Sequence, residues 1–556
     1  MLSSTSILEF PSLRKTRRYG AKVKTGCRTC KLRRVKCDER KPACVRCTST
    51  GRKCDGYAQV AGFNPQALVP TQSSSFRSTV PMLSGLGDSV LYLEFYHHCA
   101  APTLASNFDH EFWSRIVLQM AQSESAVRHA VIALGYLVKT EPGNLKHARS
   151  VSASDSRKTL LLHYNKAVRC LVHRMAESSY PIEVGLVTCL LFICIEFLRG
   201  DYYTAFTHLH SGLKIIAEWW QRPQNASQSS LPSLPSSIAI AKTVAGPSII
   251  SGKLIPMFIR AIATGLLFGA PFEPLLKRFC TRPQILQGRP FTSVLEAQSA
   301  IYGLRNATVI LVSVVTRKVI SGTKPTTKDL QYHAYLLSCH DSWFRALRIL
   351  EREGKLSRED SVVASSLKIS HYSTYIALAG AIDAHQTSFD AHISSFKALN
   401  HHAKIVLDSM NLPTSSPSAS KQGAAHFTFE ISLIPPLYFA AIHCRCPATR
   451  RESVSLLARN PPREALWDPK QHAVVARRVI EIEEREVDQE TGRPVQRTRL
   501  ASANIHGDMD ENGGFWVSFT SASWMLKGRV PRDPSRRRGH GSPMWPDSEW
   551  DEWFVM

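Results

Sequence analysis

Six of the 14 cysteines in this 556-residue chain fall within 28 residues, and clustered thiolates are ligands for metal ions. Their spacing is C-x2-C-x6-C-x6-C-x2-C-x6-C, a C-x2-C-x6-C unit repeated after 17 residues. A C-x2-C pair places two thiolates on one tight turn, and two such pairs build a tetrahedral zinc site. Six thiolates give two zinc ions four ligands each only if two of them bridge. The six are Cys27, Cys30, Cys37, Cys44, Cys47 and Cys54.

The charge around these cysteines is strongly basic. Two zinc ions and six thiolates sum to about −2, which needs cationic surroundings. Residues 1 to 60 hold 16 Lys and Arg against four acids and so supply half of the net charge of +24. Such density predicts a polyanionic partner and a steep salt dependence of its binding. Two alternatives for the cysteines stay open, a disulfide knot in an oxidising compartment and a metal store.

The run from Thr25 to Tyr57, TGCRTCKLRRVKCDERKPACVRCTSTGRKCDGY, resembles the DNA-binding domain of the fungal binuclear zinc cluster transcription factors. Cysteine number and spacing, basic content and Pro42 carry the resemblance. It implies a small metal-stabilised domain with two zinc ions. By the same resemblance, Cys27 and Cys44 bridge the two ions. Cys30 and Cys37 then complete one site, and Cys47 and Cys54 complete the other.

The two halves of the repeat differ in charge. Residues 31–36 carry four cations, whereas residues 48–53 carry two. The first half is therefore predicted to read DNA. A short helix over residues 28–36 would place Leu32 and Val35 on one face against the cluster and leave the cations outward.

Family members place consecutive basic residues, third and fourth after the second cysteine, over a CGG triplet. Here these positions are Arg33 and Arg34, and a guanidinium can donate to O6 and N7 of guanine. The alternative is that both contact only phosphates, because most protein–DNA hydrogen bonds go to the backbone. The cations predicted to contact phosphates are Arg28, Lys31, Lys36, Arg46, Arg52 and Lys53.

From residue 88 onward the apolar residues recur at helical spacing. Val127, Val131, Leu134 and Val138 form one such stripe, with Ser123 as the expected N-cap. The stretches FDHEFWSRIVLQMAQSESAVRHAVIALG and LLFICIEFLRGDYYTAFTHLHSGLKI resemble the all-helical regulatory domain of the same fungal factors. Further stripes predict helices over 160–175, 183–198 and 202–220, and a strand is expected at 514–519.

The predicted fold is a small two-zinc, six-cysteine domain followed by a large all-α regulatory domain. Three prolines and no heptad run follow the cluster, so dimerisation through a coiled coil there is not predicted. The predicted parts are a disordered basic N-terminus (1–20), the zinc cluster (21–57), a linker (58–87), the helical domain (88–526) with Ser/Pro-rich loops near 221–250 and 412–424, and a basic then acidic-aromatic tail (527–556).

The tail ends in PMWPDSEWDEWFVM, where acids alternate with aromatic residues. This composition is typical of an acidic activation segment that binds a coactivator or the general transcription machinery. The alternative, which the composition supports equally well, is that the tail docks on its own domain through its tryptophans. The residues of this candidate segment are Trp545, Asp547, Glu549, Trp550, Asp551, Glu552, Trp553 and Phe554.

These features predict a nuclear, zinc-dependent, sequence-specific regulator of transcription. The resemblance implies an activator whose targets belong to a nutrient pathway or a secondary-metabolite gene cluster, and no residue of the sequence chooses between these pathways or between an activator and a repressor. The alternative is a zinc-dependent interaction or metal-storage protein. An enzyme is not predicted, since the sequence lacks the zinc-protease pair, the phosphate-binding glycine loop and the G-x-S-x-G elbow. The longest apolar run, 184–195, is too short to span a bilayer and predicts a buried helix.

Overall fold

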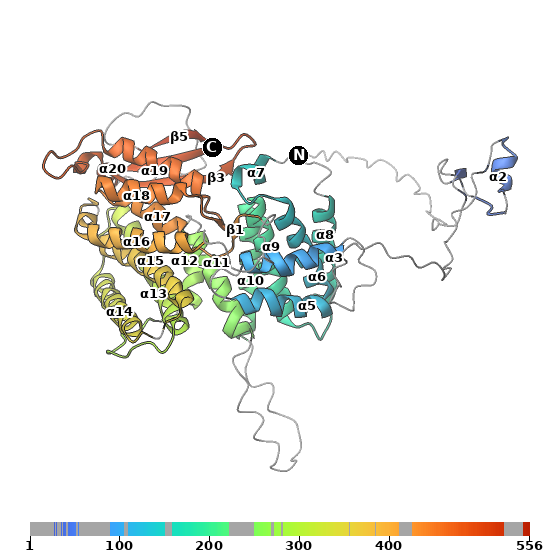
Figure 1. Cartoon of the computed structure of the whole chain (residues 1–556), viewed down its shortest axis with the longest axis horizontal. Helices are drawn as coiled ribbons and strands as arrows, with labels where there is room; N and C mark the ends of the chain where they lie inside the picture. The colour runs from blue at the N-terminus through green and yellow to red at the C-terminus, as the bar shows by residue number, and fades with distance from the viewer. Residues whose placement is uncertain are drawn as a thin grey trace, which may run out of the picture. The chain divides into compact units, whose positions relative to one another are not determined.

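The chain forms two compact units, Met1–Thr79 and Val80–Met556 (Figure 1). In the computed structural model, the first unit has a core of cysteines and the second a core of apolar side chains. The residues that the structure describes are 27, 29–30, 35, 37–40, 43–51, 54, 89–104, 109–150, 158–221, 249–267, 272–279, 282–354, 356–383, 385–410, 425–526 and 549–556.

The first unit packs around sulfur. Its buried cluster consists of Cys27, Cys30, Cys44 and Cys47, each at most 1% exposed. Helix α2 (Val45–Thr48) follows the fourth cysteine of the repeat. The helix predicted over residues 28–36 lies largely outside the described residues. Of those described there, Thr29 and Cys30 are helical, and the Val35 N–H donates to the Cys30 carbonyl at 3.1 Å.

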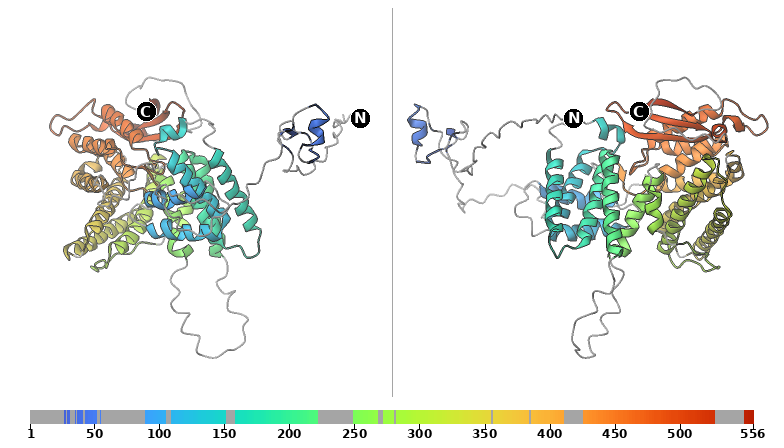
Figure 2. Two further views of the ribbon diagram at one scale, coloured as in Figure 1. Left: turned by 45° about the vertical axis from the view of Figure 1, so that its right-hand side comes forward. Right: turned by 180° about the vertical axis from the view of Figure 1, so that it is seen from behind.

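The second unit begins with helices that confirm the predicted periodicity. They lie side by side in Figures 1 and 2, and α9 is buried along nearly its whole length because it is apolar on all sides. The elements of this part are α3 (Ser89–Phe95), η1 (Tyr96–Ala100), α4 (Ala101–Leu104), η2 (Phe112–Ile116), α5 (Val117–Ser123), α6 (Ser125–Thr140), α7 (Leu145–Ser150), α8 (Lys158–Met175), α9 (Ile182–Arg199), α10 (Tyr202–Gln221), η5 (Ile250–Leu254), α11 (Ile255–Leu267) and α12 (Glu273–Phe279).

The start of α6 corrects one detail of the prediction. Ser123 is the last residue of α5, and its hydroxyl donates to the Met120 carbonyl instead of capping α6. The N-cap of α6 is Glu124, whose backbone is extended and whose side chain makes no capping bond. The apolar stripe was correct: Val127, Val131 and Leu134 are fully buried.

A second, smaller core lies between the three long helices α13 (Val294–Ile320), α14 (Thr327–Arg352) and α15 (Arg358–Gly380). The indole of Trp343 on α14 donates to the Ala297 carbonyl of α13 at 2.9 Å. A capping box between Thr326 and Asp329 begins α14. The next elements, η6 (Ser388–His392) and α16 (Ile393–Met410), pack beside α15. In Figure 1, α14 lies at the outer edge of this layer.

The C-terminal part adds helices and a three-stranded antiparallel sheet of order β3-β4-β5. The predicted strand at 514–519 is confirmed within β4, where Phe515, Val517 and Phe519 are fully buried. The elements are β1 (Phe427–Thr428), α17 (Ile434–His443), α18 (Pro447–Ala458), β2 (Arg463–Glu464), α19 (Pro469–Glu483), η7 (Gln496–Thr498), β3 (Leu500–Met509), β4 (Gly514–Ser521), α20 (Ala522–Leu526) and β5 (Glu549–Val555).

Buried charges join the C-terminal part to the helices that precede it. Arg463 of β2 donates from Nη2 to the carbonyls of Phe197 and Leu198, at 2.6 and 2.9 Å. These carbonyls lie at the C-terminal end of α9, where a cation complements the helix dipole. The residue after Arg463 is Glu464, and each of its carboxylate oxygens accepts a hydrogen bond from a backbone N–H at the start of α17.

Two helical segments, Ile250–Leu267 and Val294–Val319, are long and apolar enough to cross a membrane by length and composition. Both belong to the helical unit, where about half of each apolar segment is buried, 56% of the first and 44% of the second. Core helices pass the same test, and the partners of these segments here are other helices. The predicted loops near 221–250 and 412–424 lie almost wholly outside the described residues.

Glu483 at the end of α19 is the centre of a fully buried ion-pair network. Its two oxygens accept from Nη2 of Arg445 at 2.9 Å and from Nη2 of Arg450 at 2.7 Å. The Leu500 N–H at the start of β3 donates to the same carboxylate at 2.8 Å. Burial lowers the pKa of Arg445 to about 10, although the charge of Glu483 acts to raise it.

We predict that Glu483→Gln lowers the free energy of unfolding by about 3 to 5 kcal/mol, because it leaves two buried guanidinium groups without their carboxylate. Urea unfolding of the full chain measures the change. Glu481→Gln is the matched control, since Glu481 lies on the same helix and is 64% exposed. Equal effects of the two substitutions would contradict the role of Glu483.

Candidate metal centre and nucleic-acid interface

The six cysteine sulfurs form two overlapping groups of four. One group comprises Cys27, Cys30, Cys37 and Cys44, and within it all sulfurs lie within 4.8 Å of one another. The second group comprises Cys27, Cys44, Cys47 and Cys54, with the same limit. Cys27 and Cys44 therefore belong to both groups, as the resemblance to the fungal cluster implied.

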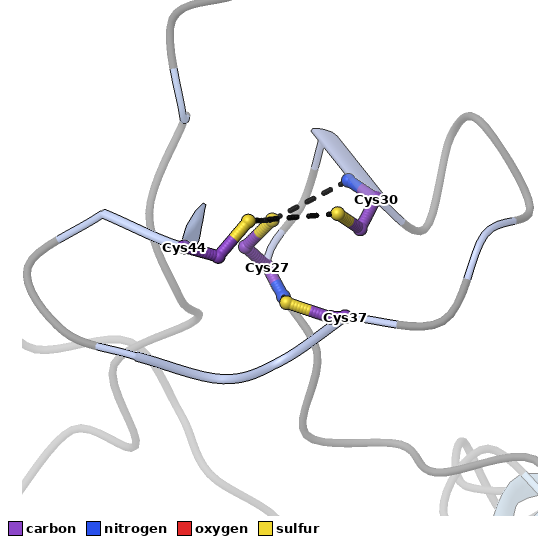
Figure 3. A group of neighbouring side chains, drawn as sticks. All are labelled: Cys27, Cys30, Cys37 and Cys44. Atoms are coloured by element: carbon purple, nitrogen blue, oxygen red, sulfur yellow. Dashed lines mark hydrogen bonds between the residues drawn. The ribbon is translucent and has the colours of Figure 1, made fainter. Parts of the chain in front are cut away.

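The sulfur separations suit tetrahedral zinc. With Zn–S bonds of about 2.3 Å, the edge of a tetrahedron of sulfurs is about 3.8 Å. The Sγ atoms of Cys27 and Cys44 are 3.5 Å apart, and Sγ of Cys30 lies 3.6 Å from that of Cys44 (Figure 3). In the second group, Sγ of Cys27 is 3.8 Å from that of Cys47. The donor set thus fits two zinc ions that share two ligands.

Backbone N–H groups support the sulfurs, and they do so with the symmetry of the repeat. The Cys27 N–H donates to Sγ of Cys37 at 3.4 Å, and the Cys44 N–H donates to Sγ of Cys54 at 3.5 Å. Both bonds span 10 residues, as expected for two copies of one unit. Such bonds favour the charged thiolate and orient it toward a metal.

Burial disfavours the thiolate in the absence of a metal ion. It raises the pKa of the Cys27 thiol to about 12 and that of Cys44 further. Because a zinc ligand must be deprotonated, the ions have to displace protons from these buried thiols as they bind. Coordination therefore supplies both the charge balance and the packing of this unit.

Asp38 connects the two halves of the repeat, a role that sequence reasoning missed. Its carboxylate accepts the N–H of Val45 at 3.0 Å and that of Arg46 at 3.4 Å, at the start of α2. Desolvation raises the pKa of Asp38, but the N–H groups of Arg46 and Val45 outweigh it, and the net pKa is below the usual value. An acid placed one residue after the third cysteine was the available signal.

Of the predicted DNA contacts, the structure describes Arg46, which is exposed on α2. Its exposure agrees with a phosphate contact, and the contact itself stays a prediction. The other predicted contacts lie outside the described residues and also stay predictions; they are Arg28, Lys31, Arg33, Arg34, Lys36, Arg52 and Lys53.

The candidate activation segment is docked where the structure describes it. Strand β5 pairs antiparallel with β4, and the ring of Trp550 stacks on Phe519 with centroids 5.4 Å apart. Arg478 of α19 holds Glu552 at 2.7 Å. Of the two alternatives, docking of the tail on its own domain is the one observed for Glu549, Trp550, Asp551, Glu552, Trp553 and Phe554, while Trp545 and Asp547 lie outside the described residues.

Both units of the chain match models of known protein families. The model of the fungal Zn(2)-Cys(6) binuclear cluster domain matches residues 25–62, and the model of the fungal specific transcription factor domain matches residues 91–450. The second match covers more than half of the chain, which therefore belongs to this family of fungal transcription factors. The binuclear cluster domain takes two zinc ions as cofactors, and the two cysteine groups can hold them.

Curated relatives are also fungal regulators. The chain is 33% identical over 240 residues to the aspercryptin biosynthesis cluster-specific transcription regulator atnN of Emericella nidulans, covering 38% of this chain and 37% of the relative. It is 29% identical over 211 residues to the transcription regulator lscL of Purpureocillium lilacinum, covering 35% and 49%. The chain thus matches less than half the length of these relatives, and no solved structure matches it.

We predict that Cys44→Ser lowers the zinc content of the full chain from about two ions to below one, because Cys44 belongs to both groups. Zinc per purified chain is measured by mass spectrometry of the metal. Cys99→Ser, at a half-buried cysteine of the helical unit, should retain both ions. Two ions in the Cys44→Ser protein would refute the shared-ligand arrangement.

Proposed function

We propose that this protein is a nuclear, zinc-dependent regulator of transcription that binds double-stranded DNA in a sequence-specific manner. The observation that carries the proposal is the pair of overlapping thiolate groups with the basic segment 28–36 between their cysteines. A fully thiolate-ligated zinc has no open position for water, so its role is structural, and it orders the segment that meets DNA.

We further propose that Arg33 and Arg34 read a CGG-type motif. Both lie in the half of the repeat with more cations, and a bidentate guanidinium–guanine pair is the commonest specific contact in the major groove. The excess of 12 positive charges in residues 1 to 60, from 16 cations and four acids, supports steep salt dependence of the affinity.

We propose that the targets are the genes of one pathway. A secondary-metabolite gene cluster is favoured over a nutrient pathway. The similarity to atnN, whose name states that it is specific for a biosynthesis cluster, supports this order. We propose that the protein acts as an activator and that the outward face of β5 contacts a coactivator or the general transcription machinery. Trp553 and Val555 are 38% and 60% exposed on that face.

Selection of duplexes from a random pool by the full chain tests the DNA-binding proposal. We expect enrichment of CGG triplets with zinc and none with a chelator, and the number of triplets per site reports monomer or dimer. Arg33→Ala with Arg34→Ala should relax the selected triplet at a cost of about 1 to 3 kcal/mol per residue.

Arg52→Ala with Lys53→Ala removes the same charge from the other half of the repeat and serves as the matched control. It should weaken binding uniformly without changing the selected sequence. No enrichment in either condition would overturn sequence-specific binding and favour the alternative of a zinc-dependent interaction protein or metal store.

Point substitutions on β5 test the activator role better than deletion, because deletion would also remove a strand of the sheet. We predict that Trp553→Ala with Val555→Ala lowers expression of a reporter several-fold while the protein stays folded and its amount is unchanged, although loss of the Trp516 contact should lower the melting temperature slightly. Tyr203→Ala, at a tyrosine 85% exposed on α10, is the control. An unchanged reporter would remove β5 from the activation mechanism.

A further inference from the structure

The helical unit contains a cavity of about 640 Å³ between α11, α13, α15 and the start of α17. This volume lies within the range of about 300 to 1,000 Å³ that is usual for sites of small organic ligands. The wall is mostly apolar, and the exposed residues Arg317 and Ser321 stand at its rim. The described residues that line it all belong to the helical unit.

One face of α13 is directed to this cavity. Arg305, Val309, Val312 and Thr316 all line it, and their spacing of four, three and four residues places them on one side of a helix. The buried residues Leu304, Leu311 and Val315 belong instead to the core shared with α14 and α15. Apolar residues of α13 therefore also lie outside the core that this helix shares with α14 and α15.

Arg305 is a charged residue within this apolar wall. Its side chain is 6% exposed, and its fully buried Nε and Nη2 atoms have no hydrogen-bond partner among the described residues. Burial of an unpaired cation is costly, so such groups normally have an anion or acceptor beside them. Other buried arginines, such as Arg445 and Arg463, each donate to a carboxylate or a backbone carbonyl.

The neighbours of Arg305 attract it, but none of the described residues accepts a hydrogen bond from its Nε or Nη2. Its guanidinium lies 4.9 Å from the centroid of the Tyr302 ring, a cation–π contact. The Tyr302 hydroxyl donates to Glu430, whose carboxylate also lies 4.0 Å from Nε of Arg260. Arg260 is paired in addition with Asp109. The two acids of this cluster therefore have other hydrogen-bond or ion-pair partners, and Glu430 attracts Arg305 through space.

A second polar atom in the wall supports the same reading. Oγ of Ser370 on α15 is buried and has no hydrogen-bond partner in the described part of the chain. Ser370 lines the cavity together with Arg305. An apolar pocket with a few polar groups on its wall is the usual design of a site that orients an amphipathic ligand.

We propose that this cavity binds an amphipathic organic acid, with the carboxylate on Arg305 and the apolar body along α13 and α15. A carboxylate can accept charge-assisted N–H bonds from a guanidinium such as that of Arg305, which lines the cavity. The cavity thereby gives the regulatory unit a receptor site for a small monoanionic metabolite. This proposal is independent of the proposed DNA binding, because the described residues that line the cavity all belong to the helical unit.

Titration of the zinc-loaded full chain with decanoate and with 1-decanol tests the proposal, and isothermal calorimetry measures both affinities. The two probes share the apolar chain and differ in the anion. We expect decanoate to bind at least tenfold more tightly than 1-decanol. Equal binding of the two, or no binding of either, would overturn the proposal, and this comparison needs no substitution.

Substitutions then locate the anion. Arg305→Met should reduce decanoate affinity at least tenfold and leave 1-decanol unchanged. It should also keep or raise the melting temperature of the free protein, since it removes a buried unpaired charge. The control is Arg317→Met, the same substitution at the rim of the cavity, which should change decanoate affinity less than threefold. A larger loss with Arg317→Met than with Arg305→Met would overturn the assignment of Arg305.

Filling the cavity provides a test that leaves both arginines in place. Ala377 on α15 lines the site, and Ala377→Phe should abolish binding of both probes. Full decanoate affinity in this variant would place the site elsewhere and overturn the proposal.

Discussion

Metal–thiolate coordination is the interaction on which the DNA-binding unit depends. In its described part, cysteines occupy the place that aliphatic side chains take in other domains, and each half of the repeat contributes to both sulfur groups. The shared sulfurs link the two ions. Asp38, which follows the third cysteine, links the first half of the repeat to the start of α2 in the second half. Folding of this unit is therefore linked to the binding of zinc and to the release of protons from its thiols.

The helical unit uses buried charge differently. Glu483 and Arg463 join elements that are distant in sequence, and their partners are carboxylates, guanidinium groups and helix-end carbonyls of the chain itself. Arg305 has no such partner in the part of the chain that the structure describes. The contrast separates buried cations that hold the fold together from one whose pairing is left to another molecule.

Local patterns predicted much of this architecture because they act over short distances. The cysteine spacing predicted the two-ion cluster, and stripes such as that of Val127 and Val131 predicted the helices. The docking of β5 was one of two open alternatives, since strand pairing depends on the partner strand rather than on local composition. The roles of Asp38 and Arg305 depend on tertiary neighbours, which periodicity does not report. Ser123 showed that a good capping residue can end one helix instead of starting the next.

The bond between Arg463 and the end of α9 has a consequence for synthesis. Its acceptor at Phe197 and its donor are 266 residues apart, which at about 5 to 20 residues per second is roughly 15 to 50 s of translation. During that time α9, apolar on every side, emerges without the segment that completes its C-terminal end. During this interval the apolar surface of α9 has no C-terminal segment to pack against, which makes it the kind of surface that chaperones bind, and completion of the fold lags behind the synthesis of the helix.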